Sequence, residues 1–128
     1  YGLNPISQYE VSPFFLDLAF PDILLAIEAD GEEYHSTDEQ LARDKYRQER
    51  LEECGWKFER FSGKFIHKNT NLIGSKIALK YFRERLTAEQ EKIALVYLVG
   101  FFTRNDSYFA QDMAQTAFDY LFPKNKTS

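Results

Sequence analysis

Residues 14–31 read FFLDLAFPDILLAIEADG, two apolar runs of strand length separated by the turn signal Pro21-Asp22. If Pro21 and Asp22 form the loop of a tight hairpin, each large apolar residue of the first run faces one of the second. The predicted pairs are Phe20 with Ile23, Leu18 with Leu25 and Leu16 with Ile27. We therefore expect a β-hairpin in which these side chains form one buried face.

Three acidic residues share the other face of this predicted hairpin. Side chains alternate along a strand, so Asp17 points away from the apolar face and lies across from Ala26. Glu28 and Asp30 lie on the same face, with Glu28 diagonal to Asp17 and about 7–8 Å from it at the backbone. Like charges at this distance repel one another, and a bound Mg²⁺ or Mn²⁺ removes that repulsion. Each acid alone fits a solvated strand face, whereas the set, with Ala19 and Ala26 beside it, favours a covered metal site.

Composition narrows the class of protein. The chain has 128 residues, enough for one domain, and 12 Phe, 8 Tyr and one Trp supply its core. A single cysteine, Cys54, excludes an internal disulfide and a multi-cysteine zinc site, and it suits a reducing compartment such as the cytoplasm. We see no signal peptide or apolar run of membrane-spanning length, so no membrane partner is expected. The chain starts at Tyr1 rather than Met, so we expect it to be a piece of a longer protein.

Charge is distributed unevenly along the chain. The net charge is −4, yet residues 1–42 hold nine acidic residues and no Lys or Arg. Residues 43–92 hold thirteen basic and eight acidic residues. An acidic pole beside a basic belt can attract a phosphate backbone while repelling it elsewhere, although ordinary helix-surface charge produces the same pattern.

The rest of the pattern predicts one strand before the hairpin, one strand after it, and several helices. The first helix has overlapping capping boxes, Ser36 with Glu39 and Thr37 with Gln40, and ends at Gly55. The expected strands cover residues 8–11 and 56–61, and the expected helices cover residues 38–54, 70–86, 88–102 and 107–121.

One stripe of the first helix combines charged and apolar residues. Asp44, Arg47, Leu51 and Cys54 follow one another at spacings of three and four. Leu51 and Cys54 are expected in the core, and the stripe then aims Arg47, with Arg43, at the acidic strands. A guanidinium there can hold a phosphate oxygen bidentately. The alternative is an Arg47–Asp44 ion pair at the sheet edge.

Three segments together resemble the PD-(D/E)XK nuclease superfamily. They are Asp17, residues 27–36 (IEADGEEYHS) and residues 42–63 (ARDKYRQERLEECGWKFERFSG). The branch that they resemble includes very-short-patch-repair endonucleases and the nuclease domains fused to some superfamily 1 helicases. This resemblance covers about residues 8–85. It implies an α/β fold, a restriction-endonuclease-like mixed sheet of about four strands flanked by helices. Residues 1–86 would form the nuclease-like core, and residues 87–128 a C-terminal helical extension of the same domain.

The resemblance also implies roles for individual residues. Asp17 and Glu28 match the metal ligands of the family. Asp30 stands where the motif usually has Lys, and it becomes a third ligand or binds the metal through water. His35 matches a histidine that follows Asp-Gly in this branch and is a candidate catalytic residue, with a surface loop position as the alternative. The missing cation has three candidates: His35, Lys45 and Arg47.

The function implied is Mg²⁺- or Mn²⁺-dependent hydrolysis of DNA, with no small-molecule cofactor, inside a larger protein such as a helicase. The family core opens with a helix, whereas only seven residues precede the first expected strand here. The alternative is therefore a degenerate nuclease fold that binds nucleic acid or a partner protein. A small-molecule enzyme is disfavoured because no phosphate-binding glycine loop is present. The expected nucleic-acid contacts are Arg43, Lys45, Arg47, Lys57, Lys64 and Lys68.

Overall fold

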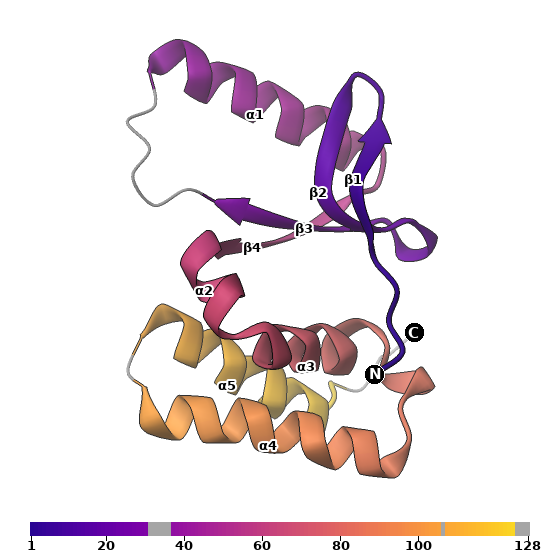
Figure 1. Cartoon of the computed structure of the whole chain (residues 1–128), viewed down its shortest axis with the longest axis vertical. Helices are drawn as coiled ribbons and strands as arrows, with labels where there is room; N and C mark the ends of the chain where they lie inside the picture. The colour runs from indigo at the N-terminus through magenta and orange to yellow at the C-terminus, as the bar shows by residue number, and fades with distance from the viewer. Residues whose placement is uncertain (31–36, 106, 125–128) are drawn as a thin grey trace. The chain divides into compact units, whose positions relative to one another are not determined.

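A computed structural model describes residues 1–30, 37–105 and 107–124. The chain forms two compact units, each of which is considered by itself (Figure 1). The sheet unit covers Asn4–Lys68, and the helical unit combines Tyr1–Leu3 with Asn69–Ser128. The expected division at residue 86 into a core and an extension of one domain stays a prediction.

The sheet unit contains a four-stranded mixed sheet, as the sequence predicted. Its strands are β1 (Ile6–Val11), β2 (Phe14–Phe20), β3 (Leu25–Asp30) and β4 (Lys57–Ser62), in the spatial order β1-β2-β3-β4. The first three strands are antiparallel neighbours, and β4 pairs parallel to β3. Helix α1 (Asp38–Glu53) lies between β3 and β4 in the chain, where a parallel pair requires a crossover. The fold is therefore α/β.

The connection between β2 and β3 is longer than the predicted two-residue loop. Pro21–Ile23 form a short 3-10 helix, η1, which suits a proline at its start. Leu24 follows in the left-handed region with a φ of 51°, and its N–H donates to Pro21 O at 3.2 Å. The two added residues shift the hairpin register by two, so the predicted pairs are wrong. The observed pairs are Leu18 with Ile27, Ala19 with Ala26 and Phe20 with Leu25.

An even shift does not by itself move a side chain to the other face, because the alternation along a strand has a period of two. Asp17, Glu28 and Asp30 therefore still share one side of the hairpin. Of the six apolar residues predicted to be buried, Leu16, Leu25 and Ile27 are buried and the other three are only half-buried.

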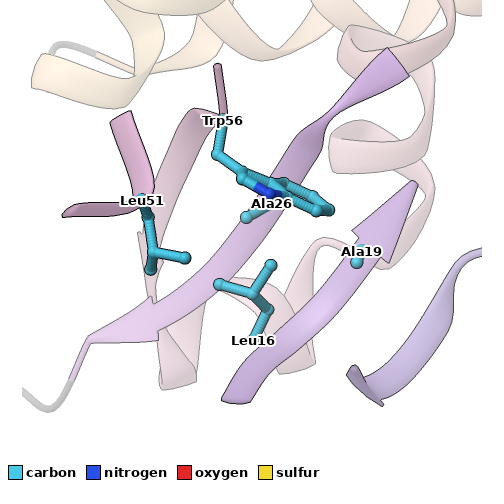
Figure 2. Packing of buried hydrophobic residues seen from close by; sticks show 5 residues of the cluster. All are labelled: Leu16, Ala19, Ala26, Leu51 and Trp56. Carbon is cyan, nitrogen blue, oxygen red and sulfur yellow. The ribbon is translucent and has the colours of Figure 1, made fainter. Parts of the chain in front are cut away.

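The core of the sheet unit lies on the alanine side of the hairpin. Buried there are Leu16, Ala19, Ala26, Leu51 and Trp56, and Figure 2 shows the Trp56 ring beside Ala26. Small residues on β2 and β3 leave room for the large side chains of α1 and the following turn. Leu16 was expected on the opposite face. The β1–β2 ladder is irregular beside Leu16. Gln8 has a φ of 48° and is not among the paired residues of this ladder.

Helix α1 begins and ends as its sequence predicts. The Thr37 hydroxyl accepts from Gln40 N and the Gln40 side chain accepts from Thr37 N, which completes one of the two predicted capping boxes. The other box includes Ser36, which lies outside the described residues. Gly55, with a φ of 94°, turns the chain after the helix. Cys54 is exposed, so its predicted core position is wrong: the helix has ended, and Trp56 fills the core instead.

Helix α2 (Gly63–Lys68) follows β4 directly and was not predicted. Ser62 Oγ accepts from Phe65 N at 3.1 Å and so caps its first turn. The Phe61 and Phe65 rings stack with centroids 5.9 Å apart. The sequence predicted a strand that ends at Phe61 and no helix between Phe61 and residue 70.

The helical unit contains α3 (Thr70–Tyr81), the short 3-10 helix η2 (Arg83–Arg85), α4 (Ala88–Arg104) and α5 (Tyr108–Leu121). Helix α3 ends at Tyr81 rather than at the predicted Leu86. The capping box of Thr87 and Gln90 is present, and Ser107 caps α5. Among the described residues, no helix is both long and apolar enough to cross a membrane.

Candidate functional site

The sheet forks at the position of the acidic residues. The ladder between β2 and β3 ends at the pair Leu18–Ile27. Beyond this pair, β2 continues along β1 as far as Phe14, whereas β3 continues along β4 as far as Asp30. Figure 1 shows β1 and β2 leaving the direction of β3 and β4. The backbone groups at the fork therefore need hydrogen-bond partners from outside the ladder.

Asp17 and Glu28 supply those partners. Each carboxylate crosses the fork: Glu28 Oε2 accepts from Asp17 N at 3.0 Å, and Asp17 Oδ2 accepts from Ala29 N at 2.9 Å. The two residues come directly after the Leu18–Ile27 pair, so they lie opposite each other rather than diagonally as predicted. Glu28 is buried, with 4% of its surface exposed. A backbone hydrogen bond from the opposite strand thus fixes the position of each carboxylate.

Arg47 neutralises the buried carboxylate. Its Nη2 donates to Glu28 Oε1 at 2.5 Å and to Phe15 O at 2.7 Å. The Glu28 side chain is 5% exposed and that of Arg47 is 23% exposed, so solvent screens this pair little. A carboxylate buried this deeply needs a counter-charge. The stripe on α1 aims Arg47 at the acidic strands as the sequence predicted, and its partner is Glu28 rather than the alternative, Asp44.

Asp30 lies apart from this pair of carboxylates. Arg60 Nη1 donates to Asp30 Oδ1 at 3.1 Å, and Arg60 Nη2 donates to Gln48 Oε1. The Asp30 side chain is 53% exposed. Within the described ranges, no group of three Asp, Glu, His or Cys side chains converges as metal ligands do. The structure therefore brings Asp17 and Glu28 together, whereas Asp30 lines the same hollow but is paired with Arg60.

These residues surround an open hollow of about 450 Å³ in the sheet unit. Its walls come from β2, β3, β4 and α1, and its lining residues are Asp17, Glu28, Ala29, Asp30, Asp44, Lys45, Arg47, Gln48 and Arg60. Acidic residues occupy the floor formed by the strands, and Lys45, Arg47 and Arg60 bring positive charge to the same hollow. Such a site combines cation ligands with groups that attract an anion.

A family model described as REase_MTES_1575 matches residues 1–78. The chain belongs to this restriction-endonuclease-like family. The match covers the whole sheet unit and reaches into α3, and it indicates a nuclease-type domain with DNA as the substrate class. No curated protein and no solved structure gives a significant match to the chain.

Members of restriction-endonuclease-like families typically use divalent metals, and the residues at the fork have the right chemistry for one. Mg²⁺ prefers oxygen ligands and is commonly held by one or two carboxylates together with water and substrate phosphates. Asp17 and Glu28 offer such a pair. The Arg47 guanidinium bound to Glu28 shows that a positive charge is already favoured at this position.

Arg60 and Gln48 line the hollow although the sequence did not predict them there. Arg60 lies in β4 in register with Glu28, and Gln48 on α1 is its partner. The sequence predicted a mixed sheet but not the β3–β4 register, and this register places Arg60 beside the acidic residues.

The remaining predicted residues differ in their position relative to the hollow. Lys45 lines the hollow with Arg47. Arg43 is exposed on α1 and is not among the lining residues. Three further expected DNA contacts, all exposed and outside the lining, are Lys57 on β4 and Lys64 and Lys68 on α2. His35 lies outside the described residues, so its catalytic role stays a prediction.

Proposed function

We propose that this domain hydrolyses DNA phosphodiester bonds with Mg²⁺ or Mn²⁺ held by Asp17 and Glu28. The observation that carries the proposal is the pair of carboxylates locked across the fork by Asp17 N and Ala29 N. Each carboxylate keeps oxygen lone pairs that these backbone bonds do not use. Membership of a restriction-endonuclease-like family supports this use of the pair over a purely structural one.

The bound cation would lower the pKa of a coordinated water and stabilise charge on the phosphate. The chain's own residues supply position and charge. Backbone hydrogen bonds hold Asp17 and Glu28 in place before any substrate arrives, which is the kind of preorganisation that favours catalysis. Lys45 and Arg47 line the same hollow and are placed to hold the scissile phosphate. They supply the positive charge that the family motif usually provides with a Lys at the position of Asp30.

The finer identity of the domain follows from its resemblance to very-short-patch-repair and helicase-fused nucleases. On this basis the chain acts as part of a larger DNA-processing, restriction or repair protein, with a helicase as the favoured kind of parent. Its single cysteine favours the cytoplasm as its location. His35 joins the site as a catalytic residue, and Asp30 assists the metal directly or through water.

A second function is favoured by the charge compensation at the site. Glu28 is already paired with Arg47 and Asp30 with Arg60. A degenerate nuclease fold that binds nucleic acid or a partner protein without cutting would retain such pairs permanently. The usual Lys is also absent from the position of Asp30.

Cleavage assays separate the two functions. The domain and the full-length protein would each be incubated with single-stranded, duplex and forked DNA in Mg²⁺ and in Mn²⁺. We expect cutting that requires metal and disappears in Asp17→Asn and Glu28→Gln. If no substrate is cut with either metal while DNA binding persists, the binding-only function replaces the nuclease.

A further inference from the structure

Both oxygens of the Glu28 carboxylate are engaged within the chain. Oε2 accepts from Asp17 N at 3.0 Å, and Oε1 accepts from Arg47 Nη2 at 2.5 Å. A divalent cation that binds Glu28 therefore meets a guanidinium already bound to the same carboxylate. Two positive charges on one buried carboxylate repel each other strongly, because little solvent screens them. The entry of a metal thus disfavours the Arg47–Glu28 ion pair.

Arg47 has another role available once it leaves Glu28. Its side chain is 23% exposed and lines the hollow, so the guanidinium can turn toward a ligand without leaving α1. A planar guanidinium matches the two oxygens of a phosphate group. Lys45, which is exposed and two residues away on the same helix, adds positive charge to the same hollow.

We propose that Arg47 couples metal binding to phosphate binding: it serves as the counter-cation of Glu28 until a divalent metal arrives, and then transfers to a phosphate of the nucleic acid. This inference rests on the proposed function and names the residue that regulates the site. Metal entry releases a phosphate-binding arginine, and a bound phosphate draws that arginine away from the metal ligand. Because coupling between two ligands is reciprocal, each one tightens the binding of the other.

The competing explanation is a fixed structural role. Arg47 Nη2 donates to Phe15 O on β2 as well as to Glu28 on β3, so it also bridges the fork. A residue that only bridges the fork would keep its contacts when metal binds. Its removal would lower stability without strengthening metal binding.

Titration calorimetry with Mn²⁺ distinguishes the two roles. The proteins compared are the wild type, Arg47→Met and Arg50→Met. Arg50 is a matched control, because it lies on the same helix in a 2.5 Å ion pair with Glu53, but that pair is exposed at 44% and 61%. Removing the competing guanidinium should tighten Mn²⁺ binding at least about fivefold in Arg47→Met, within the usual range of coupling between sites. Arg50→Met should bind as the wild type does, and adding Glu28→Gln to Arg47→Met should abolish binding.

A second measurement covers the case in which Arg47→Met folds poorly without metal. The thermal unfolding midpoint would be followed against Mn²⁺ concentration. A ligand that binds only the folded state raises the midpoint, and at a given concentration a tighter ligand raises it more. We expect Arg47→Met to start with a lower midpoint, because Glu28 is left unpaired, and to gain more from Mn²⁺ than the wild type gains.

The effect of bound DNA phosphate on Mn²⁺ affinity is tested with a short phosphorothioate DNA duplex, which resists cleavage. The duplex should tighten Mn²⁺ binding in the wild type and tighten it less in Arg47→Met. Equal or weaker Mn²⁺ binding in Arg47→Met, in a domain that still cuts DNA, would overturn the coupling and leave the nuclease function intact. Absence of Glu28-dependent Mn²⁺ binding in every variant would overturn both.

Discussion

Both compact units hold an ion pair that joins two of their elements, but they bury opposite charges. In the sheet unit the carboxylate of Glu28 is buried and Arg47 borders the open hollow. In the helical unit Lys76 on α3 is buried, with 3% of its side chain exposed, and Asp112 on α5 is 31% exposed. The charge of the buried partner determines which kind of ion can replace its more exposed partner. Another cation entering the hollow can take over from Arg47, whereas a hollow of the helical unit between α4 and α5 is lined mainly by apolar side chains and not by Lys76 or Asp112.

The difference suggests a functional pair in one unit and a structural pair in the other. Lys76 lies among buried residues of α3, including Ser75, Ile77 and Ala78. Asp112 belongs to a helix turn in which Thr116 Oγ1 donates to Asp112 O at 3.0 Å. Changes in the helical unit should therefore affect stability without any metal dependence. Changes in the sheet unit should affect metal binding first.

The largest effect on stability is expected from Asp112→Asn. This change removes the Asp112 charge from the buried Lys76 ammonium, and breaking a buried ion pair costs up to about 3–5 kcal/mol. Urea unfolding should show a loss of about 3 kcal/mol in the free energy of unfolding, and Mn²⁺ should restore none of it. Asp119→Asn is the matched control on the same helix, since Asp119 is exposed and accepts only from Gln115 Nε2. A loss no greater than the control's would contradict a structural role for the Lys76 pair.

The largest effect on metal binding is expected from Asp17→Asn and Glu28→Gln. An amide oxygen can still accept the backbone N–H that each carboxylate accepts now, so the fold should persist while Mn²⁺ binding is lost. Calorimetry gives the affinity, and circular dichroism checks the fold. Asp30→Asn should weaken binding less, because Asp30 is exposed and paired with Arg60. Unchanged affinity in both Asp17→Asn and Glu28→Gln would remove the metal site.

A smaller effect is expected on the salt dependence of DNA binding. With Mn²⁺ and a phosphorothioate duplex present, Arg47→Ala should reduce the log–log salt slope by about 0.9, the value for one phosphate contact on duplex DNA. Arg43→Ala should change the slope less, since Arg43 is outside the hollow, and Arg85→Ala serves as a control from the helical unit. If Arg47→Ala lowers the thermal unfolding midpoint but leaves the salt slope unchanged, the DNA contacts must be sought at Lys57, Lys64 and Lys68.

The smallest effect is expected from Arg60→Ala. Its ion pair with Asp30 has both side chains substantially exposed, at 38% and 53%, and solvent-screened pairs of this kind contribute about 0–1 kcal/mol. Urea unfolding should therefore place this variant close to the wild type. A loss comparable to that of Asp112→Asn would show that Arg60, and not only Arg47, stabilises the fork.

The sequence predicted the parts of the site that depend on local rules. Alternation placed Asp17 and Glu28 on one face whatever the register, and the spacing along α1 aimed Arg47 toward that face. Capping residues located the start of α1 and of α4. These features are governed by neighbouring residues, which is why they could be predicted.

The features that were missed depend on contacts between distant segments. The length of the turn at Pro21 set the hairpin register, and the β3–β4 register brought Arg60 next to Asp30. Cys54 is exposed because α1 ends at Glu53, directly before it. No sequence feature predicted the fork, because it forms where β2 stays paired with β1 while β3 stays paired with β4.

The most direct test is a crystal of the domain grown with Mn²⁺, with anomalous scattering used to locate the metal. We expect a single strong peak between the carboxylates of Asp17 and Glu28, with the Arg47 guanidinium no longer bonded to Glu28 Oε1. A Mn²⁺ peak elsewhere, or Arg47 still bound to Glu28 in saturating Mn²⁺ with no peak at the fork, would contradict the account.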